Sequence, residues 1–211
     1  MNLLIEPHYL GSQEYFTLIA KSEKITFEIN QHFTKQSYKN RSILLTANGP
    51  QTLSIPVRYG SRTPYKEVLI DHDQSWLRVH WGSFCSAYGR APYFEYFAGE
   101  FESIWFAKHK FLVDLNIELV TLCLRLLQID MLYQVTEGFE KEPNSTFLDM
   151  RELINPKLDY THRTLFKPVD YNQVFGNKFV PNLSIVDLIM NEGSNASTIL
   201  KKSTRRANEQ I

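Results

Sequence analysis

The sequence predicts an α/β or α+β fold, with a mixed sheet of about five strands, about three to four covering helices and a long C-terminal arm. Short β-prone runs dominate the first third, and three long helical patterns follow between residues 75 and 128. The 211 residues, 43% of them hydrophobic, suffice for one substantial core. We expect four parts: a main domain (1–136), an irregular arm (137–171), a C-terminal segment that packs back (172–200) and a frayed tail (201–211).

Strand signals are short runs of apolar or β-branched residues, which alternate with polar residues where one face of the sheet meets water. Such runs occur at residues 3–6, 25–30, 42–57, 66–70 and 131–135. The run at 42–57 is divided by Asn48 and Gly49, which tolerate the positive φ of a hairpin turn. This segment therefore predicts a β-hairpin.

Helix signals begin with SQEYFTLIAKS at residues 12–22, whose apolar side chains share one helical face. A second helix is expected from about Ser75 to Tyr88, and Pro92 can open a third. The segment after Asp114 is apolar almost all round, which predicts a helix at the centre of the fold. Near the C-terminus, Ser184 is a capping residue and Gly193 a terminator for a short helix.

Composition and motifs disfavour several classes of protein. Lysine plus arginine and aspartate plus glutamate both total 23, so a net charge of zero disfavours nucleic acid as a partner. The chain shows neither a signal peptide nor a membrane-spanning run, so we expect a cytoplasmic protein without membrane insertion. Cys85 and Cys123 are expected to be packed thiols, and the absence of zinc, P-loop and Rossmann motifs predicts no metal and no cofactor.

Four ordered blocks carry a family resemblance: PHYLGSQEYF, SYKNRSIL, the run from TLSIPV through KEVLID to SWLRVHWGSFCSAYGRAPYFEYF, and FLVDLNIELVTLCLRLLQI. With them the chain resembles the WbqC-like family, and its NQVFGNKFVPNLSIVDLIMNEG segment is similar to an extension in the Bacteroidetes branch. The chain has Glu6 and Gly11 where much of the family shows a glutamine and a proline. The resemblance implies a bacterial protein linked to surface polysaccharide (O-antigen) assembly, for which a glycine or acyl transferase role has been suggested.

Two histidines are the candidate catalytic residues. His8, with Tyr9 beside it as a substrate-binding candidate, follows the first predicted strand, where ligands often bind in α/β folds. The alternative is that Pro7 and Tyr9 only shape a turn. His80 shares an inward helical stripe with Trp76, and its alternative is a satisfied core residue.

The other substrate-binding candidates are Tyr38, Asn40, Arg41 and Asn116. Arg41 offers a planar fork for a carboxylate or phosphate, and Asn40 offers a paired donor and acceptor. Alternatively, Asn40 is a turn residue and Arg41 pairs with Glu28 or Asp71. Asn116 lies in an apolar helix and either braces it or lines a pocket.

These residues favour a small-molecule ligand, and the resemblance implies a transferase of small acyl, aminoacyl or sugar groups. The rival hypothesis is a non-catalytic binding or scaffold protein of the same pathway. The arm at residues 137–171 could form a lid or the contact of a homodimer.

Overall fold

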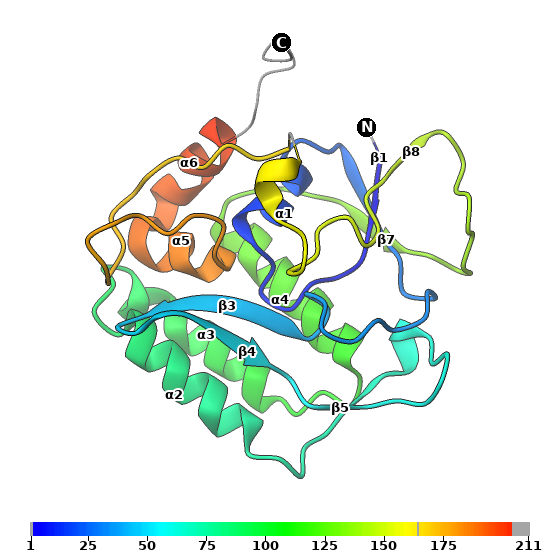
Figure 1. Cartoon of the computed structure of the whole chain (residues 1–211), viewed down its shortest axis with the longest axis horizontal. Coiled ribbons are helices and arrows are strands. Elements are labelled where there is room, and N and C mark those ends of the chain that lie inside the picture. The colour runs from blue at the N-terminus through cyan, green and yellow to red at the C-terminus, as the bar shows by residue number, and fades with distance from the viewer. Residues whose placement is uncertain (1, 164, 204–211) are drawn as a thin grey trace.

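The largest sheet of the computed structural model, which describes residues 2–163 and 165–203, is a parallel sheet of four strands, on the right in Figure 1. Its strands, in spatial order, are β7 (Tyr133–Val135), β2 (Lys24–Phe27), β1 (Asn2–Ile5) and β8 (Phe147–Asp149). All three pairings are parallel, with Ile5 beside Phe27 at the end of β1. The carboxyl ends of all four strands therefore meet at one edge of the sheet.

Four more strands form two small antiparallel sheets. They are β3 (Arg41–Thr46) with β4 (Gly49–Ser54), and β5 (Val57–Arg58) with β6 (Leu69–Ile70). The predicted hairpin is confirmed, because β3 and β4 pair around a turn in which Gly49 has a φ of +94°. The mixed α/β class is confirmed too, but the single five-stranded sheet is divided into three. One reason is that Pro56 has no N–H to continue the ladder after β4.

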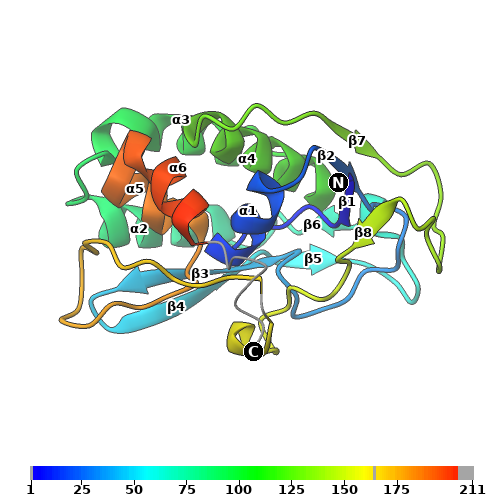
Figure 2. The same ribbon diagram turned by 90° about the horizontal axis from the view of Figure 1, so that it is seen from above.

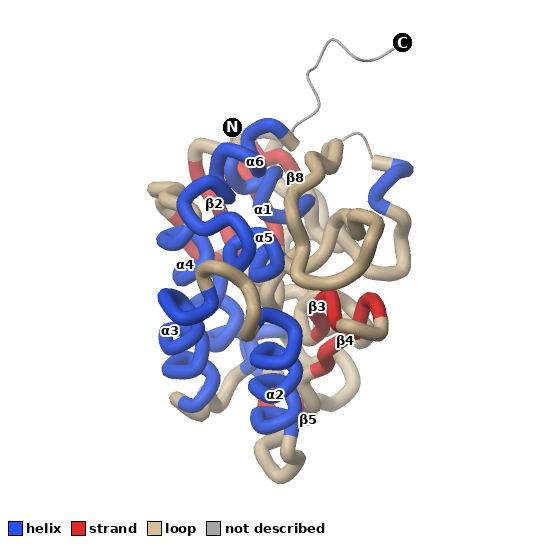
Figure 3. The backbone as a smooth tube through the Cα atoms, turned by 90° about the vertical axis from the view of Figure 1, so that its left-hand side faces the viewer, coloured by secondary structure: helices blue, strands red, loops and turns tan. Residues whose placement is uncertain are grey.

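The helices cover these sheets on several sides. They are α1 (Gln13–Ala20), α2 (Trp76–Tyr88), α3 (Phe94–Phe106), α4 (Leu112–Leu126), α5 (Ile185–Glu192) and α6 (Ala196–Lys202), with 3-10 turns η1 (Tyr65–Glu67), η2 (Tyr160–His162) and η3 (Gly193–Asn195). Helices α3 and α4 lie on one side of the molecule and the β3–β4 hairpin on the other, with α5 between them (Figures 2 and 3). Over the described residues, no helix is both long and apolar enough to cross a bilayer.

The core joins these layers through aromatic and aliphatic side chains. Leu115 and Leu119 of α4 are 1% and 0% exposed, which agrees with a helix at the centre of the fold. On α2, Trp76 and Phe84 are buried on the predicted inward stripe. Ser184 caps α5 by accepting a hydrogen bond from the backbone N–H of Val186, as its position in the sequence predicts.

The segment 137–171 differs from the expected irregular arm. It contains β8, which pairs with β1 and completes the four-stranded sheet, and the turn η2. A long arm that wraps across the domain is therefore not confirmed. Of the predicted frayed tail, residues 201 and 202 end helix α6, and residues 204–211 lie outside the described part of the chain.

Candidate functional site

Polar side chains follow each of the four parallel strands directly or within two residues. Glu6 follows β1, Glu28 follows β2, Thr136 follows β7, and Arg151 comes two residues after β8. In open sheets of parallel strands, ligands bind outside the carboxyl ends of the strands. This edge is therefore the first place to look for a site.

A cavity of about 510 Å³ lies at this edge and is lined in part by residues of the loop between β7 and β8. Its volume falls within the range of small-molecule sites. All four strands contribute, and its lining residues are Leu4, Thr26, Glu28, Gln134, Val135, Thr136, Glu137, Gly138, Glu140, Pro143, Phe147 and Arg151. We call it the sheet-edge cavity.

A buried ion pair forms the inner wall of the sheet-edge cavity. Arg151 Nη1 lies 3.2 Å from Glu28 Oε2, and the two side chains are 7% and 1% exposed. The other Glu28 oxygen accepts hydrogen bonds from the backbone N–H groups of Asn30 and Gln31 and from the Thr136 hydroxyl. Both oxygens of Glu28 are thus engaged, and the carboxylate fixes the loop after β2.

Arg151 also holds in place the loop between β7 and β8, which lines the cavity. It donates to both oxygens of Asp149, at 2.9 and 2.7 Å, and to the backbone oxygens of Glu140 and Lys141. Burial raises the pKa of Asp149, but the hydrogen bonds and charge of Arg151 outweigh it, and the pKa is lowered. The guanidinium is therefore occupied by protein groups on all sides.

A second buried ion pair lies beside the first. Lys39 Nζ is 3.0 Å from Glu6 Oε1, and each side chain is only 2% exposed. Glu6 also accepts from the backbone N–H of Glu152, the residue after Arg151. The two ion pairs are thus joined through adjacent residues of the same loop.

The structure brings Tyr9, Tyr38 and His80 together in a buried polar seam. The Tyr9 backbone N–H donates to the Tyr38 carbonyl at 2.8 Å, and the Tyr9 hydroxyl lies 2.7 Å from His80 Nδ1. His80 Nε2 lies 3.2 Å from the Ser54 carbonyl, which can only accept, so Nε2 carries the proton and Nδ1 accepts from Tyr9. Burial lowers the pKa of His80 to about 4, although the Ser54 contact opposes this.

His8 occupies the same seam. Its ring stacks on Tyr15 at 4.3 Å and lies 5.6 Å from the Tyr38 ring. Burial, with a smaller contribution from the charge of Lys39, lowers the pKa of His8 to about 3. In this arrangement the imidazole is neutral and a weak base.

Asn116 links the seam to the turn after β1. Its Nδ2 donates to the Lys39 carbonyl and to the Tyr65 hydroxyl, both at 2.6 Å, and lies 3.4 Å from the Pro7 carbonyl. These bonds agree with the bracing alternative for this residue. Its Oδ1 has no partner among the described residues.

Asn40 and Arg41 lie where the seam reaches the β3–β4 hairpin. Asn40 Nδ2 donates to the Ile55 carbonyl, and Arg41 pairs with Ser54 in the ladder. The expected partners of Arg41 are taken, because Glu28 binds Arg151 and Asp71 binds Arg58. Arg41 has no carboxylate partner in the described part of the chain, and its buried Nε is unpaired there.

The seven predicted residues are therefore connected, but they lie apart from the sheet-edge cavity. One of the seven, His80, lines a groove of about 430 Å³ between β4 and the start of α2. The sequence reasoning missed Glu6, Glu28, Lys39 and Arg151. A polar residue directly after a strand could have indicated Glu6 and Glu28, whereas the burial of Lys39 depends on distant segments.

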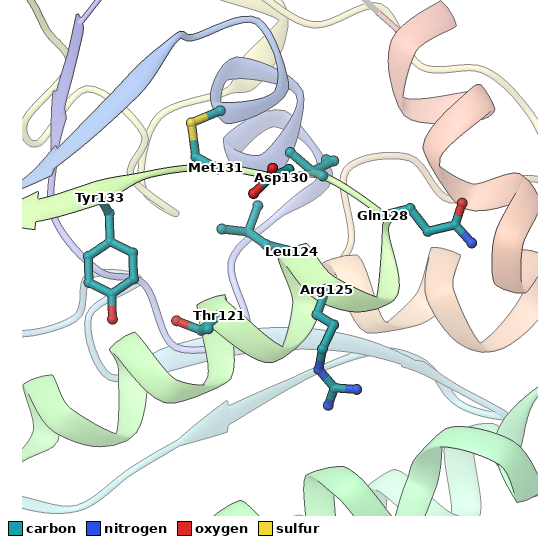
Figure 4. Close-up of a pocket in the computed structure, with 8 residues that line it drawn as sticks. Thr121, Leu124, Arg125, Gln128, Asp130, Met131 and Tyr133 are labelled. Carbon is teal, nitrogen blue, oxygen red and sulfur yellow. The ribbon is translucent and has the colours of Figure 1, made fainter.

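Another hollow of about 430 Å³ lies beside the end of α4, with the lining residues Thr121, Leu124, Arg125, Gln128, Ile129, Asp130, Met131 and Tyr133 (Figure 4). The polar ends of Arg125, Gln128 and Tyr133 lie apart from one another there and do not point to one spot. Arg125 is moreover paired with Glu100. This hollow lacks the convergent polar groups of a specific site.

Within residues 2–163 and 165–203, no three histidine, cysteine or acidic side chains are grouped to hold a metal ion. Comparison with known proteins gives a family: the model of the WbqC-like protein family matches residues 6–163 and 154–199. The uncharacterized protein Rv1507c of Mycobacterium tuberculosis (strain ATCC 25618 / H37Rv) is 25% identical over 224 residues, covering 94% of this chain and 96% of that protein. No solved structure matches the chain.

Proposed function

The chain belongs to the WbqC-like protein family, and from this premise we propose that it is a transferase of small acyl, aminoacyl or sugar groups in the assembly of bacterial surface polysaccharide. The observation that carries the proposal is the sheet-edge cavity. It has the size of a small-molecule site and is lined by polar residues that follow parallel strands. The resemblance to the WbqC-like family supports surface polysaccharide assembly as the pathway.

The open polar groups of the sheet-edge cavity favour a ligand rich in hydrogen-bond donors. Glu28 and Arg151 are occupied by each other and by the backbone, whereas the carboxylates of Glu137 and Glu140 have no described partner. Carboxylates only accept hydrogen bonds. Hydroxyl and amino groups, which sugars and aminoacyl groups carry, match them.

Thermal-shift screening against nucleotide sugars, acyl-coenzyme A compounds and amino acids tests this proposal. A ligand that binds the native state raises the melting temperature by mass action. The rise should be lost in the double variant Glu137→Gln/Glu140→Gln and kept in Glu142→Gln, which removes an exposed carboxylate that does not line the cavity. If no compound shifts the wild type, or if the cavity variant responds unchanged, the proposal is wrong.

A specific observation also favours the second candidate, a non-catalytic binding protein of the same pathway. Apolar side chains are exposed on and beside the edge strand β7: Leu132 at 76%, Tyr133 at 42%, Val135 at 43% and Phe139 at 51%. Exposed apolar side chains along an unpaired strand edge are typical of a protein interface. Partner binding by this surface should be lost in Leu132→Ser/Phe139→Ser, with catalytic turnover absent in the wild type as well.

The homodimer expected through residues 137–171 stays a prediction. β8, η2 and the loop that covers the cavity all lie within this range. A dimer formed there would place the partner beside the sheet-edge cavity. Light scattering with the purified chain measures its mass directly.

A further inference from the structure

A groove of about 430 Å³ lies between β4 and the first turns of α2, which are neighbours in Figures 1 and 3. We call it the β4–α2 groove; it is lined by residues 51–56, 74–76, 79 and 80. Its volume falls within the range of small-molecule sites. Solutes can reach it from the solvent, because its lining includes the exposed side chains of Gln51, Thr52, Ser54, Gln74, Ser75 and Val79.

The lining of the β4–α2 groove carries no formal charge. Among the described residues that line it there is no aspartate, glutamate, lysine or arginine. His80 is neutral near pH 7, because burial lowers its pKa to about 4. Asp71 accepts a hydrogen bond from Gln74 but is already paired with Arg58. A charged ligand would leave water here without an opposite charge to meet it, so the groove favours an uncharged ligand.

Hydroxyl and carboxamide groups supply the polar surface of this groove. Ser75 precedes the first turn of α2, but its hydroxyl makes no capping hydrogen bond. Gln51 Nε2 makes one long contact, 3.5 Å from the Ser83 hydroxyl. Hydroxyls and carboxamides can both donate and accept hydrogen bonds. The hydroxyl groups of a sugar do both as well, so they match this surface.

A buried indole with a free N–H lines the same groove. Trp76 is 5% exposed, and its Nε1 has no hydrogen-bond partner among the described residues. The ring is held in place against His80, with the two ring centres 5.1 Å apart in an edge-to-face arrangement. A buried tryptophan N–H usually has a partner. An acceptor oxygen of a ligand in the groove would provide one.

We propose that the β4–α2 groove binds an uncharged saccharide. The exposed hydroxyls and carboxamides bind its hydroxyl groups, its C–H face packs against Val79, and one of its oxygens accepts from the Trp76 indole. The groove shares no lining residue with the sheet-edge cavity. The inference therefore goes beyond the proposed transferase function, and it holds equally for a non-catalytic binding protein.

An extended peptide fits this groove less well than a saccharide does. A peptide that adds to a sheet edge depends on a row of backbone hydrogen bonds. Pro50 and Pro56 flank residues 51–55 of the groove, and proline has no N–H to offer an added strand. A saccharide uses the side-chain groups instead and is not affected by these prolines.

Nuclear magnetic resonance of the indole N–H groups tests the proposal, with maltose, lactose and N-acetylglucosamine as probes. The chain has three tryptophans, and Trp81 and Trp105 do not line the groove, so their signals are internal controls. At least one of the three sugars should shift the Trp76 signal in a saturable way and leave the other two indole signals in place. If no sugar shifts it, or if glucuronate or a blocked alanine tripeptide shifts it as much, the proposal is wrong.

A double variant shows whether the sugar binds through the groove itself. Thr52→Val/Ser75→Ala removes two exposed hydroxyls and should weaken sugar binding by about tenfold, as expected for two neutral hydrogen bonds. Ser61→Ala/Ser86→Ala removes two exposed hydroxyls that do not line the groove and should bind as the wild type does. Equal binding by the two double variants overturns the assignment to this groove.

The two proposed sites can be tested separately. Glu137→Gln/Glu140→Gln alters the sheet-edge cavity and should leave the sugar-dependent shift of Trp76 unchanged. If that variant abolishes the shift, the sugar binds in the sheet-edge cavity and the inference about the β4–α2 groove is wrong.

Discussion

Two buried histidines should make the protein lose stability steeply in mild acid. Burial lowers the pKa of His8 to about 3, with Lys39 adding to the effect, and lowers the pKa of His80 to about 4. In the unfolded chain both rings titrate near 6.5. Between these values the unfolded state binds more protons than the folded state, so the free energy of unfolding falls as pH falls.

The size of the effect follows from the shifts. Each pH unit below the unfolded pKa lowers the free energy of unfolding by ~1.4 kcal/mol per histidine, until the folded pKa is reached. At pH 5 each ring therefore costs ~2 kcal/mol relative to neutral pH, and both together cost ~4 kcal/mol. This is a large fraction of the ~5–15 kcal/mol by which domains are stable.

Urea unfolding at pH 7.5 and pH 5, in the wild type and in His8→Phe, measures the contribution of one ring. Phenylalanine keeps an aromatic ring against Tyr15 but cannot take up a proton. The variant should lose ~2 kcal/mol less than the wild type between the two pH values. Other titrating groups are common to both proteins and cancel in the comparison.

His162→Phe is the matched control, because solvent reaches that ring, and it should lose as much stability as the wild type. An equal loss in wild type and His8→Phe would refute the reasoning, since it would mean that His8 does not stay neutral in the folded state. A lower free energy of unfolding of His8→Phe at both pH values would not refute the reasoning, because a change in packing lowers stability equally at each pH.

Three further predictions concern buried polar contacts. Glu28→Gln removes one of the two carboxylates that pair with Arg151, since Asp149 remains, and should cost ~1–3 kcal/mol in urea unfolding, and an unchanged midpoint would contradict this. Asn116→Ala loses its bonds to Lys39 and Tyr65 and should cost roughly 1–3 kcal/mol. A variant that melts like the wild type would refute the bracing role. Burial raises the pKa of Asp187, so the free energy of unfolding falls as pH rises and this carboxyl ionises. The hydrogen bond from the Tyr171 hydroxyl stabilises the ionised carboxylate and so opposes the rise in pKa. Tyr171→Phe removes this bond and should therefore cost more stability at pH 7 than at pH 4. Equal costs at the two pH values would contradict that sign.

Local patterns predicted the helices from α1 to α5 and the hairpin, because their signals lie within a few residues of each other, whereas α6 was not predicted. The stripe on α2 repeats at helical spacing and packs inward as expected. At the end of α5, Gly193 has a φ of +53°, and a side chain there would collide with the ring of Tyr93. A capping serine and a terminating glycine can thus be recognised from the sequence alone.

Strand β8 could not be recognised in the same way. It has three residues, too few for an alternating pattern, and polar residues and prolines surround it. It becomes a strand because β1 provides a parallel partner more than a hundred residues away in sequence. The same distance hides the pairing of Lys39 with Glu6, since a lysine in a polar loop gives no sign of being buried.

The position of β8 also explains why the sheet-edge cavity was missed while the buried seam was found. Histidine, arginine and asparagine are natural site candidates in any sequence. His80 and Asn116 of the buried polar seam do take part in its hydrogen bonds. A polar stretch commonly contains residues such as Glu137, Glu140 and Arg151, so they do not indicate a site. Only the pairing of β8 with β1 brings Arg151 to Glu28. A Leu148→Pro substitution should therefore disturb the cavity through β8 itself, because proline lacks the N–H of the ladder. Ligand-dependent thermal shifts should then disappear while the acid sensitivity of His8, which comes mainly from burial of its ring beside Tyr15 and Tyr38, is kept.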